Sequence, residues 1–211
     1  MNYTQLVAEI QSYTENQFQT DDINTFIRQA EQRIYNSVQL PALRKNVTGV
    51  LTVNNKYLTC PTDWLATYSI AVIDSLGNYD YLLNKDVNFI RASYPAPTST
   101  GLPEYYALFD QNTFILGPTP DDNYSVELHY YYYPESIVTA GSTWLGNNFD
   151  SALLYGSLLE AYTYMKGEPD VIGEYQKRYD AAMALLKRLG DGLDRNDAYR
   201  RGQTSLEYKG L

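Results

Sequence analysis

The stretch that decides the fold is residues 130–188, YYYYPESIVTAGSTWLGNNFDSALLYGSLLEAYTYMKGEPDVIGEYQKRYDAAMALLKR. A tyrosine-rich strand closes with a proline, and a loop containing Gly and Asn leads to a nearly all-apolar helix that begins at Phe149. Gly167 and Pro169 interrupt that helix, and a second, amphipathic helix runs to about Leu189. The stretch therefore predicts a β region that leads into a pair of helices.

The two predicted helices differ in their patterns. The first is apolar on most sides, which is typical of a helix that lies centrally among others. It also carries small residues that allow another helix to approach closely: Ala152, Gly156, Ser157 and Ala161. The second has one apolar face, made of Ile172, Tyr175, Tyr179, Ala182, Met183, Leu186 and Leu189. Gly190 and Gly192 are predicted to end it and to release an extended tail.

Two more helices are predicted at the start of the chain. Leu6 and Ile10 mark a short first helix. In the second, apolar residues recur at spacings of three and four, a strong amphipathic signal, and Pro41 ends the pattern. Those residues are Ile23, Phe26, Ile27, Ala30 and Ile34.

Between the helix pairs the apolar period changes to two, which indicates strands. Three hairpins are predicted: residues 47–53 with 56–60, residues 68–74 with 79–83, and residues 105–108 with 113–116. Residues 124–133 form the longest predicted strand, and Asp86 is placed to cap a short helix. The expected fold is α+β. Residues 1–42 and 147–189 form a discontinuous helical bundle, residues 45–137 an inserted antiparallel β domain, and residues 190–211 an extended C-terminal tail.

Composition and charge narrow the classes of function that this protein can have. The chain of 211 residues contains 22 tyrosines, and tyrosine suits subunit interfaces because it joins a large apolar ring to a polar end. The net charge of −9 argues against a protein that binds nucleic acid by neutralising phosphates. Residues 187–211 are an exception: their six basic and four acidic side chains leave a net charge of +2 and predict an acidic partner surface.

The sequence offers no catalytic or metal-binding constellation. His129 is the only histidine and Cys60 the only cysteine, and no phosphate loop or dinucleotide fingerprint is present. We therefore expect no enzymatic activity, no metal and no cofactor. No stretch approaches transmembrane length and no secretion signal is apparent, so no membrane association is expected.

One carboxylate stands out in the apolar helix. Glu160 lies among Leu and Ala residues, and a buried carboxylate needs a partner. The candidates on neighbouring helices are Arg28, Arg33 and Arg178. The interpretation is a structural ion pair that fixes helix register, in preference to a proton-transfer carboxylate.

The order of these elements resembles the head-to-tail adaptor proteins of short-tailed bacteriophages, the tail tubular protein A type. The resemblance covers nearly the whole chain. Its motifs are the stripe from Ile23 to Ile34, LTCPTDW at 58–64, TFILGP at 113–118, ELHYYYYP at 127–134, LLYGSLLEA at 153–161 and the helix with Tyr175, Tyr179 and Leu186.

The resemblance implies a structural virion protein: a ring of twelve copies below the portal, joining it to the tail nozzle and forming part of the DNA channel. The partners implied are the portal protein, the nozzle protein, further copies of the chain, and double-stranded DNA that passes through without specific binding. The resemblance also implies that the protein assembles in the host cytoplasm and lies in the tail or neck of the virion. In that family the helical part and the C-terminal tail contact the portal.

The tail residues expected to bind the portal are Arg195, Tyr199, Arg200, Arg201, Leu206 and Tyr208. The arginines would make forked contacts to carboxylates, Tyr199 and Tyr208 would fill pockets between adjacent subunits, and Leu206 would be a further apolar anchor. Alternatives are a neck or head-completion connector of a long-tailed phage, and a carbohydrate-binding module that uses Trp64, Trp144 and tyrosines as stacking platforms. The least favoured alternative is a hydrolase built on Glu160 and His129.

Overall fold

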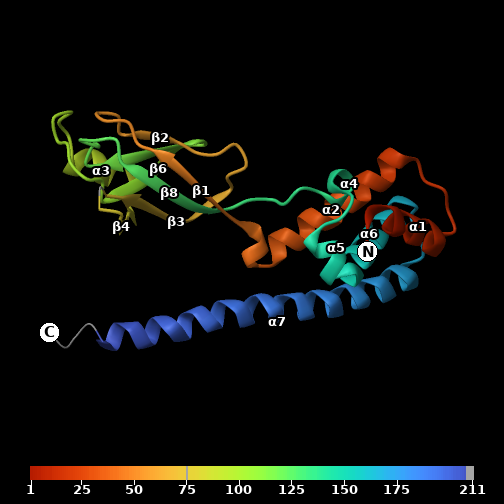
Figure 1. Ribbon diagram of the computed structural model, residues 1–211. Helices are drawn as coiled ribbons and strands as arrows, with labels where there is room; N and C mark the ends of the chain where they lie inside the picture. The colour runs from red at the N-terminus through yellow and green to blue at the C-terminus, as the bar shows by residue number, and fades with distance from the viewer. Residues whose placement is uncertain (75, 208–211) are drawn as a thin grey trace. The chain divides into compact units, whose positions relative to one another are not determined.

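The computed structural model describes the backbone of residues 1–74 and 76–207, and side chains over 1–74 and 76–192. The chain divides into two compact units (Figure 1). The helical unit contains Met1–Leu43 and the chain from Tyr133 onward, and the β unit is Arg44–Tyr132. Apart from α3 (Val87–Ser93) in the β unit, helices and mostly antiparallel strands lie in separate units, which confirms the predicted α+β class.

The helical unit is organised around α6. Its elements are α1 (Tyr3–Thr14), α2 (Thr20–Ser37), the 3-10 turn η1 (Pro41–Leu43), α4 (Ile137–Ala140), α5 (Trp144–Asn148), α6 (Asp150–Tyr164) and α7 (Pro169–Glu207). Helix α6 packs against α1, α2, α5 and α7. Eight of its residues are buried, which is why its sequence is apolar on most sides. The short helices α4 and α5 occupy a segment predicted as loop.

Helix α2 buries the stripe that the sequence indicates. Ile23, Ile27 and Ile34 are at most 1% exposed, and Phe26 and Ala30 are buried with them. Two acidic residues, Asp21 and Asp22, lie in the first turn, where they favour the positive end of the helix dipole. The helix therefore forms from a local charge preference together with an apolar face that α6 covers.

Helix α7 corrects the prediction of an extended tail. The helix does not end near Leu189: it continues through Gly190 and Gly192 to Glu207. A helical Gly costs only about 1 kcal/mol relative to Ala, too little to end a helix that no proline follows. Gly190 has a packing role instead, because a Cβ there would lie 2.6 Å from the backbone oxygen of Gln39.

The β unit contains two four-stranded sheets. The first has the order β1-β8-β3-β4 and the second the order β2-β7-β6-β5. The strands are β1 (Arg44–Val50), β2 (Tyr57–Thr59), β3 (Ala66–Ile73), β4 (Tyr79–Tyr81), β5 (Leu83–Asn84), β6 (Tyr105–Asp110), β7 (Thr113–Gly117) and β8 (Ser125–Tyr131), with α3 (Val87–Ser93) between β5 and β6. The core between the sheets includes Ile70, Val72, Phe114 and Leu128.

Two of the three predicted hairpins are confirmed: β3 pairs with β4, and β6 with β7. The first hairpin is wrong, because β1 pairs with β8 and β2 with β7. The turn at Asn54 and Asn55 carries the chain from one sheet to the other, and a period of two identifies a strand without identifying its neighbour. The Asp86 cap is confirmed by a 2.7 Å bond from the N–H of Asn88 to its carboxylate.

Candidate functional site

The contact between α2 and α6 is close because both helices carry small residues there. A Cβ on Gly156 would lie 3.1 Å from the Cβ of Ala30 and 3.2 Å from the ring of Tyr179 on α7. Gly156 is therefore the position where α2 and α7 both approach α6. Ala161, also small, is fully buried on the same helix.

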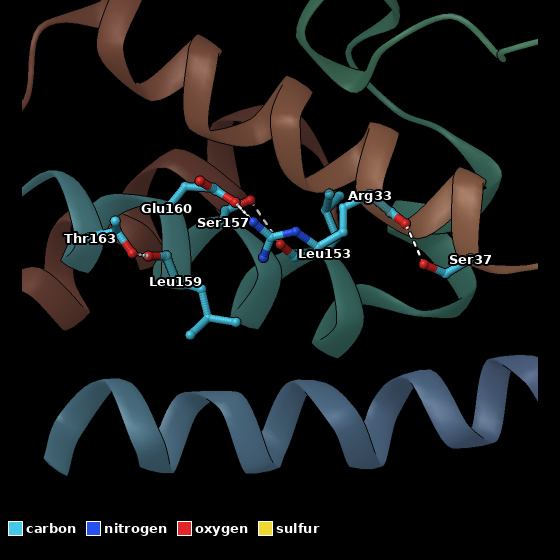
Figure 2. A network of polar contacts seen from close by, with 7 residues as sticks. All are labelled: Arg33, Ser37, Leu153, Ser157, Leu159, Glu160 and Thr163. Carbon is cyan, nitrogen blue, oxygen red and sulfur yellow. Dashed lines mark hydrogen bonds and ion pairs between the residues drawn. The ribbon is translucent and has the colours of Figure 1, made fainter. Parts of the chain in front are cut away.

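Hydroxyl groups in this contact are satisfied within their own helices (Figure 2). The Ser157 hydroxyl donates to the carbonyl of Leu153 at 2.8 Å, and the Thr163 hydroxyl donates to the carbonyl of Leu159 at 2.7 Å. On α2, the Ser37 hydroxyl donates to the carbonyl of Arg33 at 2.7 Å. Ser157 is the buried residue of the three, and its bond offsets the desolvation penalty of its hydroxyl inside the helix.

Glu160 forms an ion pair with Arg33 across α6 and α2 (Figure 2). The carboxylate side chain is 15% exposed and the arginine 46%. Arg178, a second predicted partner, instead contacts Glu174 at 3.0 Å and the hydroxyl of Tyr155 at 3.3 Å. The third, Arg28, is exposed on α2. The structure therefore brings one of the three predicted arginines to Glu160.

A second carboxylate, Glu31, is not predicted by the sequence analysis. It is 3% exposed and accepts a hydrogen bond from the backbone N–H of Ile137 at 2.8 Å. Burial raises its pKa above the usual range, while the bonds from Ile137 and Ser136 and the charge of Arg28 act in the opposite direction. The available signal is its spacing, since Glu31 lies four residues after Ile27 on the apolar stripe of α2.

Tyrosines join three helices of the unit. The ring of Tyr175 on α7 lies 5.1 Å from that of Tyr162 on α6 and 6.4 Å from that of Tyr13 on α1. The Tyr162 hydroxyl donates to the backbone oxygen of Tyr13 at 2.9 Å. Burial, with a hydrogen bond to Tyr162, raises the pKa of Tyr175 to about 12. Part of the tyrosine content therefore serves helix packing.

Other aromatic side chains remain exposed on the β unit. Tyr57, Tyr79 and Tyr81 are 39%, 49% and 66% exposed, and Phe109 is 38% exposed beside Tyr57. Exposed rings on strands are typical of surfaces that are covered in an assembly.

The side chains considered for catalysis or metal binding make packing contacts. The His129 ring packs edge-on against Tyr68, with centroids 5.0 Å apart. Cys60 is buried in the β core, and burial raises the pKa of its thiol to about 11, far from the range of a reactive thiolate. Within the residues that the structure describes, no three His, Cys, Asp or Glu side chains gather as metal ligands do.

The β unit also has an open pocket of ≈ 510 Å³ beside Trp64. Lys85 and Asp86 contribute charged lining, and Tyr106 and Phe114 contribute aromatic lining. The Trp64 ring packs edge-on against Phe114 at 5.6 Å and donates its N–H to Thr67 at 3.3 Å. Its contacts are those of a side chain that closes the core. The other tryptophan, Trp144, lies in the helical unit beside Phe149.

Most of the residues predicted to bind the portal lie on the distal part of α7. Arg195, Tyr199, Arg200, Arg201 and Leu206 fall where the structure describes the backbone alone, and Tyr208 lies outside the described residues. They are therefore carried by a helix, where an extended tail was expected. Arg195, Tyr199 and Leu206 follow one another at spacings of four and seven residues, a period that repeats on one helical face.

No helix in the described part of the chain has both the length and the apolarity needed to cross a bilayer. A search of curated proteins found no match. A scan against protein families matches the SU10 adaptor protein over residues 1–205. That match spans both units and almost all of α7, so the chain belongs to the SU10 adaptor protein family, a family of the phage head-to-tail adaptor type.

Proposed function

We propose that this protein forms the ring that joins the portal to the tail nozzle of a short-tailed phage, with twelve copies around the DNA channel. The observation that carries the proposal is the family match over residues 1–205, which includes both units. The packing agrees with a structural role, because two carboxylates of the helical unit, Glu160 and Glu31, each bond to a neighbouring helix.

In this proposal α7 provides the portal contact. Its first part packs on α6, and Tyr179, Met183 and Leu186 on this part are all at most 6% exposed. Beyond Gly192 the helix continues to Glu207. A helix that extends a packed element can lie in a groove of a partner, and the net charge of +2 over residues 187–211 suits an acidic groove.

The charge of the remaining chain suits a DNA channel. Outside residues 187–211 the chain carries a net charge of −11. Carboxylates that line a lumen repel the phosphates of double-stranded DNA, so the genome passes without sticking. The ring is proposed to assemble in the host cytoplasm and to remain in the neck or tail of the virion.

The test is the mass of the assembled particle, measured by native mass spectrometry on this protein alone, on the portal alone and on their mixture. Each bound copy adds 24.1 kDa, and twelve are expected on one portal. A portal that gains no mass over a range of protein concentrations and salt would contradict the proposed function. A homogeneous particle with a different copy number would contradict only the twelvefold symmetry.

A further inference from the structure

Strand β1 leaves one edge of its sheet unpaired among the described residues. It pairs with β8 along Arg44–Val50, without a register shift, and forms the end of the order β1-β8-β3-β4 (Figure 1). Proteins usually protect such edges with proline, a bulge, a very short strand or charged side chains, lysine above all. Strand β1 is seven residues long and contains no proline, and its two charged residues, Arg44 and Lys45, both lie at its beginning. The uncharged edge over residues 46–50 can therefore accept another strand.

The side chains of β1 after Arg44 are also exposed. Val47 lies opposite Leu128 in the register, so both side chains point to the same face of the sheet. Leu128 is 4% exposed on that face, whereas Val47 is 39% exposed. Val50, at the end of the strand, is 65% exposed. The core that covers β8 thus stops short of β1, and an added neighbour would bury these apolar groups.

The other end of the same sheet is β4, which pairs only with β3 among the described residues and is three residues long, so an added strand would pair with it over a short stretch. Tyr79 and Tyr81 are exposed on it. Asp80 lies opposite Val72, which is fully buried, so Asp80 points to the core face of the sheet and yet remains exposed. Both free edges therefore have an uncovered residue on the core side.

The directions of the two edges suit each other. Each strand of this sheet is antiparallel to the next, from β1 through β8 and β3 to β4, so β1 and β4 run in opposite directions. When copies are arranged head to tail, β4 of one copy meets β1 of the next as an antiparallel pair, with their core faces on the same side.

The charges of the two edges agree with this pairing. Strand β1 carries two cations, Arg44 and Lys45, and no acid, whereas β4 carries Asp80 and no base. Lys45 is opposite Tyr130, which is buried, and so points to the core face, as Asp80 does. It also forms an ion pair with Asp63 at 2.8 Å within its own copy, so Asp80 of the next copy would share this ammonium group with Asp63.

We propose that β1 of one copy pairs with β4 of the next, so that this sheet continues from subunit to subunit. The inference rests on the proposed ring and names the surfaces that close it. A ring needs two different surfaces that meet head to tail, and β1 and β4 are such a pair. Pairing of β1 with β1 across a twofold axis would stop at a dimer.

Hydrogen exchange tests the pairing without assuming its register. Amides of residues 44–50 and 79–81 are compared in the separate subunit and in the assembly on the portal. The outward-pointing amides are expected to exchange at least about tenfold more slowly once they are bonded to a neighbour. Strand β7 is central in the other sheet and serves as the internal control, because its exchange is expected to be slow in both states.

Two variants test the edges by introducing a lysine. Val50→Lys changes β1, and Asp80→Lys changes β4. The matched control is Leu76→Lys, in the turn between β3 and β4, at a residue that is 85% exposed. Edge lysines oppose strand addition, so each edge variant is expected to need at least about tenfold more protein to assemble. The control is expected to assemble as the parent does, and all three to melt at the parent temperature.

The outcomes separate this inference from the proposed function. If the assembly forms with unchanged exchange at both edges and both lysine variants assemble normally, the pairing is wrong while the ring stands. Protection of β1 without β4 indicates a twofold pair or a strand from another virion protein, and also overturns the pairing. If no assembly forms at all, both proposals fail.

Discussion

Glu31 and Ile137 lie 106 residues apart in sequence and are joined by a 2.8 Å hydrogen bond from the Ile137 N–H to the Glu31 carboxylate. The bond satisfies an N–H at the start of α4 and connects the N-terminal helices to the segment that follows the β unit. Glu31 is 3% exposed, so this connection is made by a buried carboxylate.

Glu31→Ala is expected to lower the free energy of unfolding by about 1–3 kcal/mol, because the buried N–H of Ile137 loses its acceptor. Glu31→Gln keeps an oxygen that can accept the bond and is expected to retain most of the stability at pH 7. Urea unfolding at pH 7 measures both. Equal losses for the two substitutions would mean that the bond itself contributes little.

The same pair predicts a pH dependence. Burial raises the pKa of Glu31 in the folded protein above 4.5, its ordinary value. The folded state then holds the proton to higher pH than the unfolded state, so this group's contribution is complete below pH 4.5 and is lost as pH rises through the folded pKa. The glutamine side chain of Glu31→Gln does not titrate. The stability of this variant relative to the parent is therefore expected to increase with pH above 4.5 and then to level off, in melting curves recorded from about pH 4 to about pH 8.

Leu158→Asp is expected to cost several kcal/mol, because Leu158 is fully buried at the centre of the helical unit and the new charge would have no partner. Leu185→Asp is the matched control: the same substitution on α7, at a side chain that is 60% exposed, should change stability by about 0.5 kcal/mol or less. Thermal melting of the separate subunit compares them. Similar melting temperatures would contradict the central position of α6.

Gly190→Ala and Gly192→Ala separate a packing glycine from a solvent-exposed one on α7. A Cβ at Gly190 would meet the backbone oxygen of Gln39 at 2.6 Å, so this variant is expected to loosen α7 and lower stability. Nothing lies within 4 Å of a Cβ at Gly192. This substitution should therefore stabilise the helix, by about 1 kcal/mol at most, and increase helicity. Circular dichroism and melting measure both. A loss of helicity in Gly192→Ala would contradict the continuous helix.

The sequence predicts what depends on local periodicity and misses what depends on a distant neighbour. The stripe of α2 and the hairpin of β6 and β7 follow from patterns within one segment. The partner of β1 does not, because six strands and one helix lie between β1 and β8 along the chain, and no local pattern refers to β8. Gly190 has the pattern of a stop signal, because the sequence cannot show the Gln39 carbonyl that excludes a side chain there.

The carboxylates show the same division. Glu160 is conspicuous because it interrupts an almost entirely apolar helix, and it does pair with an arginine. Glu31 is inconspicuous because α2 is rich in polar residues, so one acid on its buried face does not stand out. Its partner is a backbone N–H, which every residue except proline carries, and no residue type marks it in the sequence.

The last prediction concerns the distal part of α7. Deleting residues 191–211 retains Gly190 and the packed residues of α7, such as Leu186, which is fully buried. The shortened protein is therefore expected to fold, with a melting temperature within a few degrees of the parent, but to lose most of its binding to the portal. Surface binding to immobilised portal at several salt concentrations measures the loss.

A charge variant then separates the contribution of the arginines from that of the helix as a whole. Replacing Arg195, Arg200 and Arg201 by Gln keeps the length of the chain and removes three positive charges. If the arginines contact carboxylates of the portal, the affinity of the parent for the portal should fall as the salt concentration rises. The variant should bind the portal weakly, and its affinity should depend less on salt. The matched control is Lys177→Gln, an exposed position on the proximal part of the same helix, which should bind as the parent does. If the deleted protein still binds the portal with unchanged affinity, α7 is not the portal contact, and another surface of the protein must provide it.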